Sequence, residues 1–146
     1  MKRKGYSFRN HTADVELAAH GKTVGEAFKN AVLAMFDTSA DISALAKAKA
    51  AGKALKINDG AASLEDLLWV TLQDTLSLAD SNRVYGYRVE KMEITGKEGS
   101  YKVRSEFRAK EQAPQYSIIY VKGVSRYRLK VAKRGKEFRV GAVLDV

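Results

Sequence analysis

Two kinds of hydrophobic spacing divide the chain into helical and extended segments. Apolar residues recur every three or four positions in residues 24–36 and 64–79, which is the spacing of an amphipathic helix. In half-buried strands apolar and polar residues alternate, and this pattern occurs in residues 6–9, 15–20, 54–57, 84–95, 101–109, 116–132 and 137–144. The pattern predicts an α+β fold in which two helices pack on one face of a mixed, largely antiparallel β-sheet.

Polar residues mark where both helices begin. Thr23 and Glu26 form a capping-box pattern, in which the Thr23 hydroxyl accepts from the Glu26 amide and the Glu26 side chain reaches back to the Thr23 amide. Ser63 is the expected N-cap of the second helix, and the acidic residues that follow it complement the positive helix end. Trp69 falls beside the apolar stripe of that helix, so we expect it to rim the core or a partner surface.

Turn-forming residues separate the predicted strands. Residues 58–60 (Asn-Asp-Gly) carry a turn signal, and residues 96–99 and 133–136 are expected to close hairpins. Residues 37–52 are rich in small residues and lysines, which predicts a loop with one irregular helical turn. The length of 146 residues fits a single domain, residues 1–146.

Composition narrows the chemistry that the chain can carry. The sequence has no cysteine and two histidines, which excludes a thiolate zinc site and a cysteine nucleophile and nearly excludes a multi-histidine metal site. Any metal would therefore need oxygen ligands. The basic N-terminus is not followed by an apolar segment, and no apolar run is long enough to cross a bilayer, so we expect a cytoplasmic protein.

The charge is positive and lies mainly toward the two chain ends. Of the formal net charge of +9, residues 1–10 carry +4 and residues 100–146 carry +8. Such an asymmetry favours RNA, a nucleotide or an acidic protein surface as a partner, although lysines on a solvated strand surface give the same pattern. Aromatic residues interleaved with these bases allow an alternative function, an RNA-binding or chaperone-like module with a basic, tyrosine-rich sheet face: Tyr101, Phe107, Tyr116, Tyr120 and Tyr127.

Carboxylates near the two ends of the chain are candidates for a metal site. Asp14 ends a His-Thr-Ala-Asp segment between the first two strands, and Asp145 lies beside the α-carboxylate of Val146 in an apolar segment expected to be locked into the sheet. If these groups converged, their mutual repulsion would favour one hard divalent cation, Ca²⁺, Mg²⁺ or Mn²⁺. The pattern of strands does not itself place Asp14 beside Asp145, and a turn-forming Asp14 with a packed or exposed His11 is the alternative.

Several motifs together resemble the archease family over nearly the whole chain. They are residues 6–14 (Tyr-Ser-Phe-Arg-Asn-His-Thr-Ala-Asp), 21–23 (Gly-Lys-Thr), 26–28 (Glu-Ala-Phe), 66–68 (Asp-Leu-Leu), 121–125 (Val-Lys-Gly-Val-Ser) and 143–146 (Val-Leu-Asp-Val). The resemblance implies that Asp14, Asp145 and Val146 are metal-binding positions, with Val146 contributing a main-chain or terminal oxygen. It also implies a non-catalytic activator of an RtcB-type RNA ligase, which helps the ligase to form its covalent guanylate and to turn over repeatedly in tRNA splicing and RNA repair.

The resemblance implies further that GTP is bound only through the partner ligase. The family usually has Lys-Ala-Val-Thr-Tyr-His where this chain has residues 122–127, Lys-Gly-Val-Ser-Arg-Tyr, so that Arg126 and Tyr127 replace a Tyr-His pair. Lys122 is retained, and we expect Lys122 and His11 to contact the partner or a nucleotide phosphate, unless Lys122 is a solvated strand lysine. The sequence has no P-loop, no paired Ser/His nucleophile and no Gly-x-Ser-x-Gly elbow, which agrees with an activator that is not an enzyme.

Overall fold

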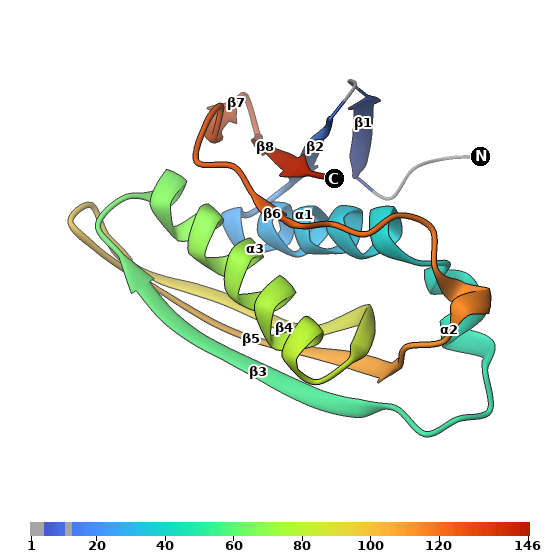
Figure 1. Ribbon diagram of the computed structural model, residues 1–146. Helices are drawn as coiled ribbons and strands as arrows, with labels where there is room; N and C mark the ends of the chain where they lie inside the picture. The colour runs from blue at the N-terminus through green and yellow to red at the C-terminus, as the bar shows by residue number, and fades with distance from the viewer. Residues whose placement is uncertain (1–4, 11–12) are drawn as a thin grey trace.

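The strands form two antiparallel sheets with the longer helices between them (Figure 1). This computed structural model describes residues 5–10 and 13–146. The upper sheet has the order β1 (Tyr6–Asn10), β2 (Asp14–Gly21), β8 (Glu137–Asp145) and β6 (Gly123–Val124), and β7 (Lys130–Arg134) also pairs with β8. The lower sheet has the order β3 (Lys53–Ala61), β5 (Ser100–Glu111) and β4 (Val84–Lys97).

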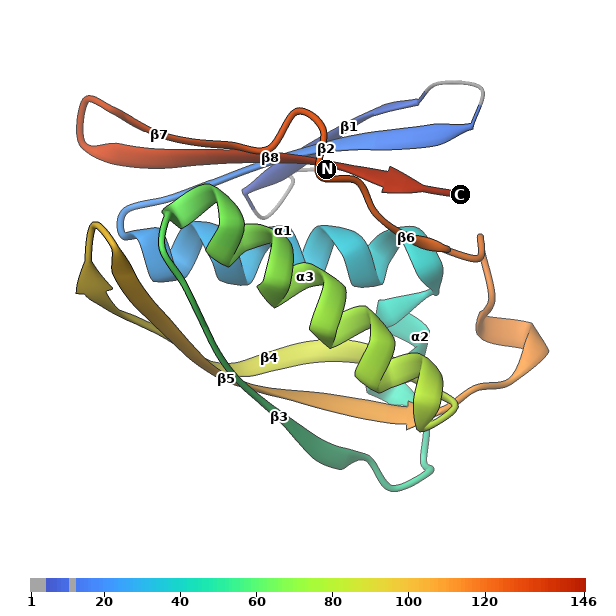
Figure 2. The ribbon, with the colours of Figure 1, turned by 60° about the vertical axis from the view of Figure 1, so that its left-hand side comes forward.

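The helices form the middle layer, which a second view shows between the two sheets (Figure 2). They are α1 (Val24–Ser39) and α3 (Leu64–Ser81), with a short α2 (Ile42–Lys47) after α1. The predicted α+β class, with helices packed on antiparallel strands, is confirmed. The described residues form three α-helices and two sheets, where the sequence predicts two helices and one sheet. Among the described residues, no helix is both long and apolar enough to span a membrane.

Because α1 lies between two sheets, it buries residues on two faces and not only along the one apolar stripe that its spacing predicts. Phe28, within the predicted stripe, is fully buried, and so is Ala34, which lies outside that stripe. A helix covered on two sides buries opposite faces, and alanine at the second face leaves room for a sheet. The core is therefore continuous across the layers, and α1 packs on β2 and β8 above and on β4 below.

Side-chain caps begin both long helices at the predicted residues. The Thr23 hydroxyl accepts from the Glu26 amide at 3.0 Å, and the Ser63 hydroxyl accepts from the Asp66 amide at 3.1 Å. The return contact differs from the prediction, because Glu26 Oε1 accepts from the Lys22 amide at 2.6 Å and not from the Thr23 amide. The carboxylate still satisfies a backbone donor at the helix start, one residue earlier than a standard capping box.

Two predictions for the middle of the chain are wrong. Residues 58–60 continue β3 and do not form a turn, because Asn58 pairs with Arg104 and Gly60 with Lys102 in the ladder with β5. Residues 37–52 complete α1 and add a regular helix, α2, whose first turn is capped by Asp41 Oδ1 accepting from the Ala44 amide at 3.0 Å. In both places tertiary or capping contacts outweigh weak local propensity.

The predicted strand over residues 116–132 is also largely wrong. Only β6 and the start of β7 are extended, and a 3₁₀ turn, η1 (Pro114–Tyr116), precedes them. Between η1 and β6 the backbone bonds to the end of α1, since the Ile118 amide donates to the Ser39 carbonyl at 2.9 Å. The aromatic residues of the alternative function therefore do not share one strand face: Phe107 is in the core, whereas Tyr120 and Tyr127 are exposed on irregular segments.

Two carboxyl groups meet between the lower sheet and α3. Asp59 on β3 shares a side-chain hydrogen bond with Asp74 on α3. The pKa of Asp59 is raised to about 7, mainly because the carboxyl is partly buried and secondly because Asp74 lies beside it. The unfolded chain loses this proton near pH 4 whereas the folded protein keeps it until about pH 7. The contribution of Asp59 to stability is therefore greatest at low pH and falls as the pH rises from 4 to 7.

We expect Asp59→Asn to raise the melting temperature at pH 8 and to change it little near pH 4.5. The amide replaces the protonated carboxyl as a donor to Asp74 and removes the cost of ionising a second carboxylate beside the first. Thermal unfolding between pH 4.5 and 8 measures this difference. Glu93→Gln, at an exposed position, is the control and should not follow the same profile, and a gain for Asp59→Asn that is independent of pH would contradict the assignment.

Candidate functional site

The pairing of β2 with β8 brings the two predicted metal-binding aspartates together. The register runs from Gly21 opposite Phe138 to Asp14 opposite Asp145, at the last pair of the ladder. Side chains directly opposite each other on antiparallel strands point to the same face of the sheet, with Cβ atoms roughly 4.5–5.5 Å apart. Asp14 and Asp145 are therefore cross-strand neighbours at one end of the upper sheet, although they are 131 positions apart in the sequence.

The end of β8 is held on both sides by backbone hydrogen bonds. The Lys122 amide donates to the Asp145 carbonyl at 2.7 Å, and the Val146 amide donates to the Ala13 carbonyl at 3.3 Å. Val146 also packs against the core, so its main-chain atoms are fixed beside the aspartate pair. The Lys122 side chain is exposed next to this pair, whereas His11 lies outside the described residues.

The aspartate pair has the electrostatic character of a site for a cation. Asp14 is half-buried, and its Oδ1 atom is buried with no hydrogen-bond partner in the part of the chain that the structure describes. Two carboxylates directly opposite each other in a ladder repel, and the buried oxygen adds the cost of lost solvation. A positive ion beside both carboxylates would relieve both effects.

The available donors fit a hard divalent cation. Within residues 5–10 and 13–146, no three His, Asp or Glu side chains are grouped so as to hold a metal. A cation at this end of the sheet would therefore use the carboxylates of Asp14 and Asp145, together with main-chain oxygen such as that of Val146. Carboxylate and main-chain oxygens are the ligands that Ca²⁺, Mg²⁺ and Mn²⁺ prefer.

Arg128 is a nearby charged residue that the sequence did not single out. Its φ of 64° places it in a left-handed turn, and its Nη1 lies 3.8 Å from Glu16 Oε2. The pKa of the Arg128 guanidinium is raised by Tyr127, then by Glu16 and, to a smaller extent, by Asp14. The spacing of hydrophobic residues does not predict an arginine with left-handed backbone conformation in a loop.

The family profile settles what kind of protein has this arrangement. The profile of the Archease protein family (MTH1598/TM1083) matches residues 6–146, which includes both aspartates. The chain belongs to the archease family. Archease relatives from Methanosarcina acetivorans and Methanosarcina mazei are each 28% identical over 145 residues, covering 98% of this chain and 97% of the relative.

Two solved structures share the archease fold of this chain. The solution structure of Methanobacterium thermoautotrophicum protein 1598 matches with a TM-score of 0.82 and 23% identity, covering 98% of this chain and 99% of the other. The crystal structure of an archease, possible chaperone, from Thermotoga maritima matches with a TM-score of 0.62 and 17% identity, covering 93% of each chain. At these identities the likeness shows the fold.

In this archease Arg126 contacts side chains of α3. The Arg126 guanidinium carbon lies 3.8 Å from the centre of the Trp69 ring, and Arg126 Nη1 lies 3.9 Å from Asp66 Oδ1. Trp69 Nε1 donates to the Val124 carbonyl at 2.7 Å, and Gln73 Oε1 accepts from the Val124 amide at 2.9 Å. Trp69 is half-buried at the rim of the core, and this contact fixes β6 beside Asp145.

Proposed function

We propose that this archease is a non-catalytic, metal-binding activator of an RtcB-type RNA ligase, which promotes guanylylation of the ligase and its multiple turnover in tRNA splicing and RNA repair. The observation that carries the proposal is the pairing of Asp14 with Asp145 at an exposed end of the upper sheet. In this arrangement a carboxylate pair can be presented to a partner while the fold behind it stays rigid.

The residues of this chain would hold and orient a divalent cation, and the partner ligase would carry out the chemistry. Asp14 and Asp145 would supply carboxylate oxygens, and Val146 would supply a main-chain or terminal oxygen, to one Ca²⁺, Mg²⁺ or Mn²⁺ ion. When bound, a divalent cation neutralises charge that develops on phosphate oxygens during nucleotidyl transfer. GTP would be bound only through the ligase, and Lys122, exposed beside Asp145, would contact the ligase or a nucleotide phosphate.

The proposed role agrees with the description of the Thermotoga maritima archease as a possible chaperone, because a chaperone also acts through a partner protein. His11, three positions before Asp14 in the sequence, remains a proposed partner contact. A protein with this role would work in the cytoplasm together with its ligase. The alternative of RNA binding through a tyrosine-rich sheet face is less well supported, since Phe107 is buried and Tyr127 lies in a loop.

A guanylylation assay with an RtcB-type ligase tests the proposal. We expect Asp145→Asn to reduce stimulation of ligase guanylylation by at least about tenfold, because loss of one metal-binding carboxylate weakens the cation site. Glu93→Gln, which removes an exposed carboxylate on the lower sheet, is the control and should stimulate as wild type does. Full stimulation by a folded Asp145→Asn variant would show that the aspartate pair does not act in activation.

A further inference from the structure

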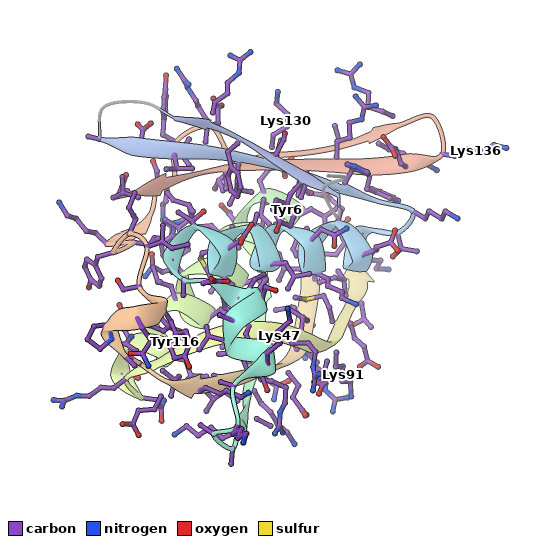
Figure 3. All side chains as sticks on the ribbon, turned by 90° about the vertical axis from the view of Figure 1, so that its right-hand side faces the viewer. Tyr6, Lys47, Lys91, Tyr116, Lys130 and Lys136 are labelled. Atoms are coloured by element: carbon purple, nitrogen blue, oxygen red, sulfur yellow. The ribbon has the colours of Figure 1, made fainter. Side chains whose placement is uncertain are left out.

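The outer face of the upper sheet, which points away from the helices, is hollowed into a groove of about 610 Å³. Its floor crosses three strands at small residues, because Ser7 pairs with Ala18 and Ala18 with Gly141. Lys130 on β7 pairs with Gly141 at the end of this row, and Figure 3 shows its side chain above the sheet. We call this feature the outer groove, and its size is within the range of small-ligand sites.

The loop between β6 and β7 borders the outer groove through Arg128. The Ser125 amide donates to the Val143 carbonyl at 2.9 Å, and the Ser125 hydroxyl accepts from the Tyr127 amide at 3.0 Å. This loop rises on the outer side of the sheet (Figure 2). It brings Arg128 Nη1 to 3.8 Å from Glu16 Oε2, so a positively charged side chain stands at the edge of the outer groove.

The outer groove is strongly cationic. Five cationic side chains line it against two carboxylates, a net charge of +3, and the cations are Arg9, Arg128, Lys130, Arg134 and Arg139. The two carboxylates are already engaged, because Glu16 lies 3.8 Å from Arg128 and Glu137 Oε1 accepts from Arg139 Nε at 3.0 Å. Arg9, Lys130 and Arg134 form no ion pair within the described ranges, so their charge is available to a ligand.

We propose that the outer groove binds the phosphate groups of a nucleotide, either free or within an RNA strand. Arginine and lysine around a hollow of this size match a multiply charged phosphate better than a single carboxylate, because arginine forks bind phosphate oxygens in pairs. The small residues of the floor allow such a group to approach the strands. Cations on opposite rims, Arg9 on β1 and Lys130 on β7, surround the bound charge.

The outer groove lies on the same face of the sheet as the aspartate pair but uses different residues. Along β2, Asp14, Glu16, Ala18 and His20 share one face, so the groove begins one row from the candidate cation site. Phosphate binding in the groove does not depend on ligase activation or on a bound cation. It is therefore measured on the isolated protein in EDTA, and its failure leaves the guanylylation test unaffected.

Binding of GTP, guanosine and a short single-stranded oligoribonucleotide tests the proposal, by calorimetry or fluorescence anisotropy at low salt. We expect GTP or the oligonucleotide to bind and guanosine to bind at least about tenfold more weakly, since only guanosine lacks phosphate. Gly141→Val should weaken phosphate binding by about tenfold by filling the floor. A Cβ at Gly141 would lie 3.6 Å from the Leu17 carbonyl oxygen, an ordinary contact, and circular dichroism checks that the valine variant folds.

Charge variants distinguish binding in the outer groove from nonspecific attraction to the positive charge of the whole protein. Arg9→Ala and Lys130→Ala should each weaken binding several-fold, whereas Lys91→Ala, an exposed lysine on β4, should not. Preferred binding of GTP would assign the groove to a free nucleotide, and displacement of GTP by the oligonucleotide would assign it to RNA. Any of four results would overturn the proposal. Two concern the ligands: the protein binds no phosphate ligand, or it binds guanosine as well as GTP. Two concern the variants: Lys91→Ala weakens binding as much as Lys130→Ala, or folded Gly141→Val binds fully.

Discussion

We expect Lys110→Met to lower the free energy of unfolding by about 1.5–3 kcal/mol, because it removes two hydrogen bonds from a charged donor and leaves the buried Leu45 carbonyl with only the Ala48 amide as a donor, at 3.2 Å. Lys110 is 6% exposed, and its Nζ donates to the Leu45 carbonyl at 2.6 Å and to the Ala48 carbonyl at 2.8 Å. It thus ties β5 to the C-terminal end of α2, where a positive charge is favourable. Methionine keeps most of the apolar stem and removes the charge.

Urea denaturation of the variant, with Lys91→Met as the matched control, measures this effect. Lys91 is exposed, with its Nζ 3.7 Å from Glu93 Oε1, and such a surface pair contributes about 0–1 kcal/mol. Lys110 Nζ also lies 4.9 Å from the centre of the Tyr87 ring, so the fluorescence of the protein should report the loss of this contact. Equal destabilisation by the two substitutions would show that the buried hydrogen bonds contribute nothing.

The parts of the fold that were predicted correctly depend on contacts close in the sequence. Thr23 and Ser63 cap their helices through residues three positions ahead, so the pattern alone identifies them. Asn58 and Gly60 were wrongly expected to form a turn, because the strand there depends on pairing with β5, more than 40 residues away. The burial of Lys110 has no signal in the sequence, because it follows only from the position of α2.

The sequence likewise predicts some features of the candidate site and not others. Asp14 and Asp145 were selected from the sequence by their chemistry and by resemblance to archeases, but their adjacency depends on the register of β2 with β8. The positive charge toward the two chain ends indicated a partner such as RNA or a nucleotide, but the floor of the outer groove gave no signal, since it joins Ser7, Ala18 and Gly141 from three strands in a row perpendicular to the chain. Periodicity along one strand tells which face a residue shares, and it does not tell which residues lie beside it across the sheet.

We expect Asp14→Asn and Asp145→Asn to reverse their effect on stability according to whether a divalent cation is present. In EDTA each substitution removes repulsion between opposed carboxylates and should leave the protein as stable as wild type or more stable, by about 0.2–1 kcal/mol. With Ca²⁺, Mg²⁺ or Mn²⁺ at a hundred times its dissociation constant, wild type should gain about 2.7 kcal/mol and the variants should gain little. Thermal unfolding with and without the cation measures both effects.

The sign of the effect in EDTA decides whether the aspartates serve the fold or a ligand. Asp14 Oδ1 has no hydrogen-bond partner among the residues that the structure describes, so its loss should not weaken the end of β2. If both variants melt well below wild type in EDTA, the carboxylates are structural groups that hold the turn before β2 and the end of β8. If none of the three cations raises the melting temperature of wild type or of the control Glu93→Gln, the aspartate pair binds no metal. Activation of a ligase through a shared cation would then be excluded.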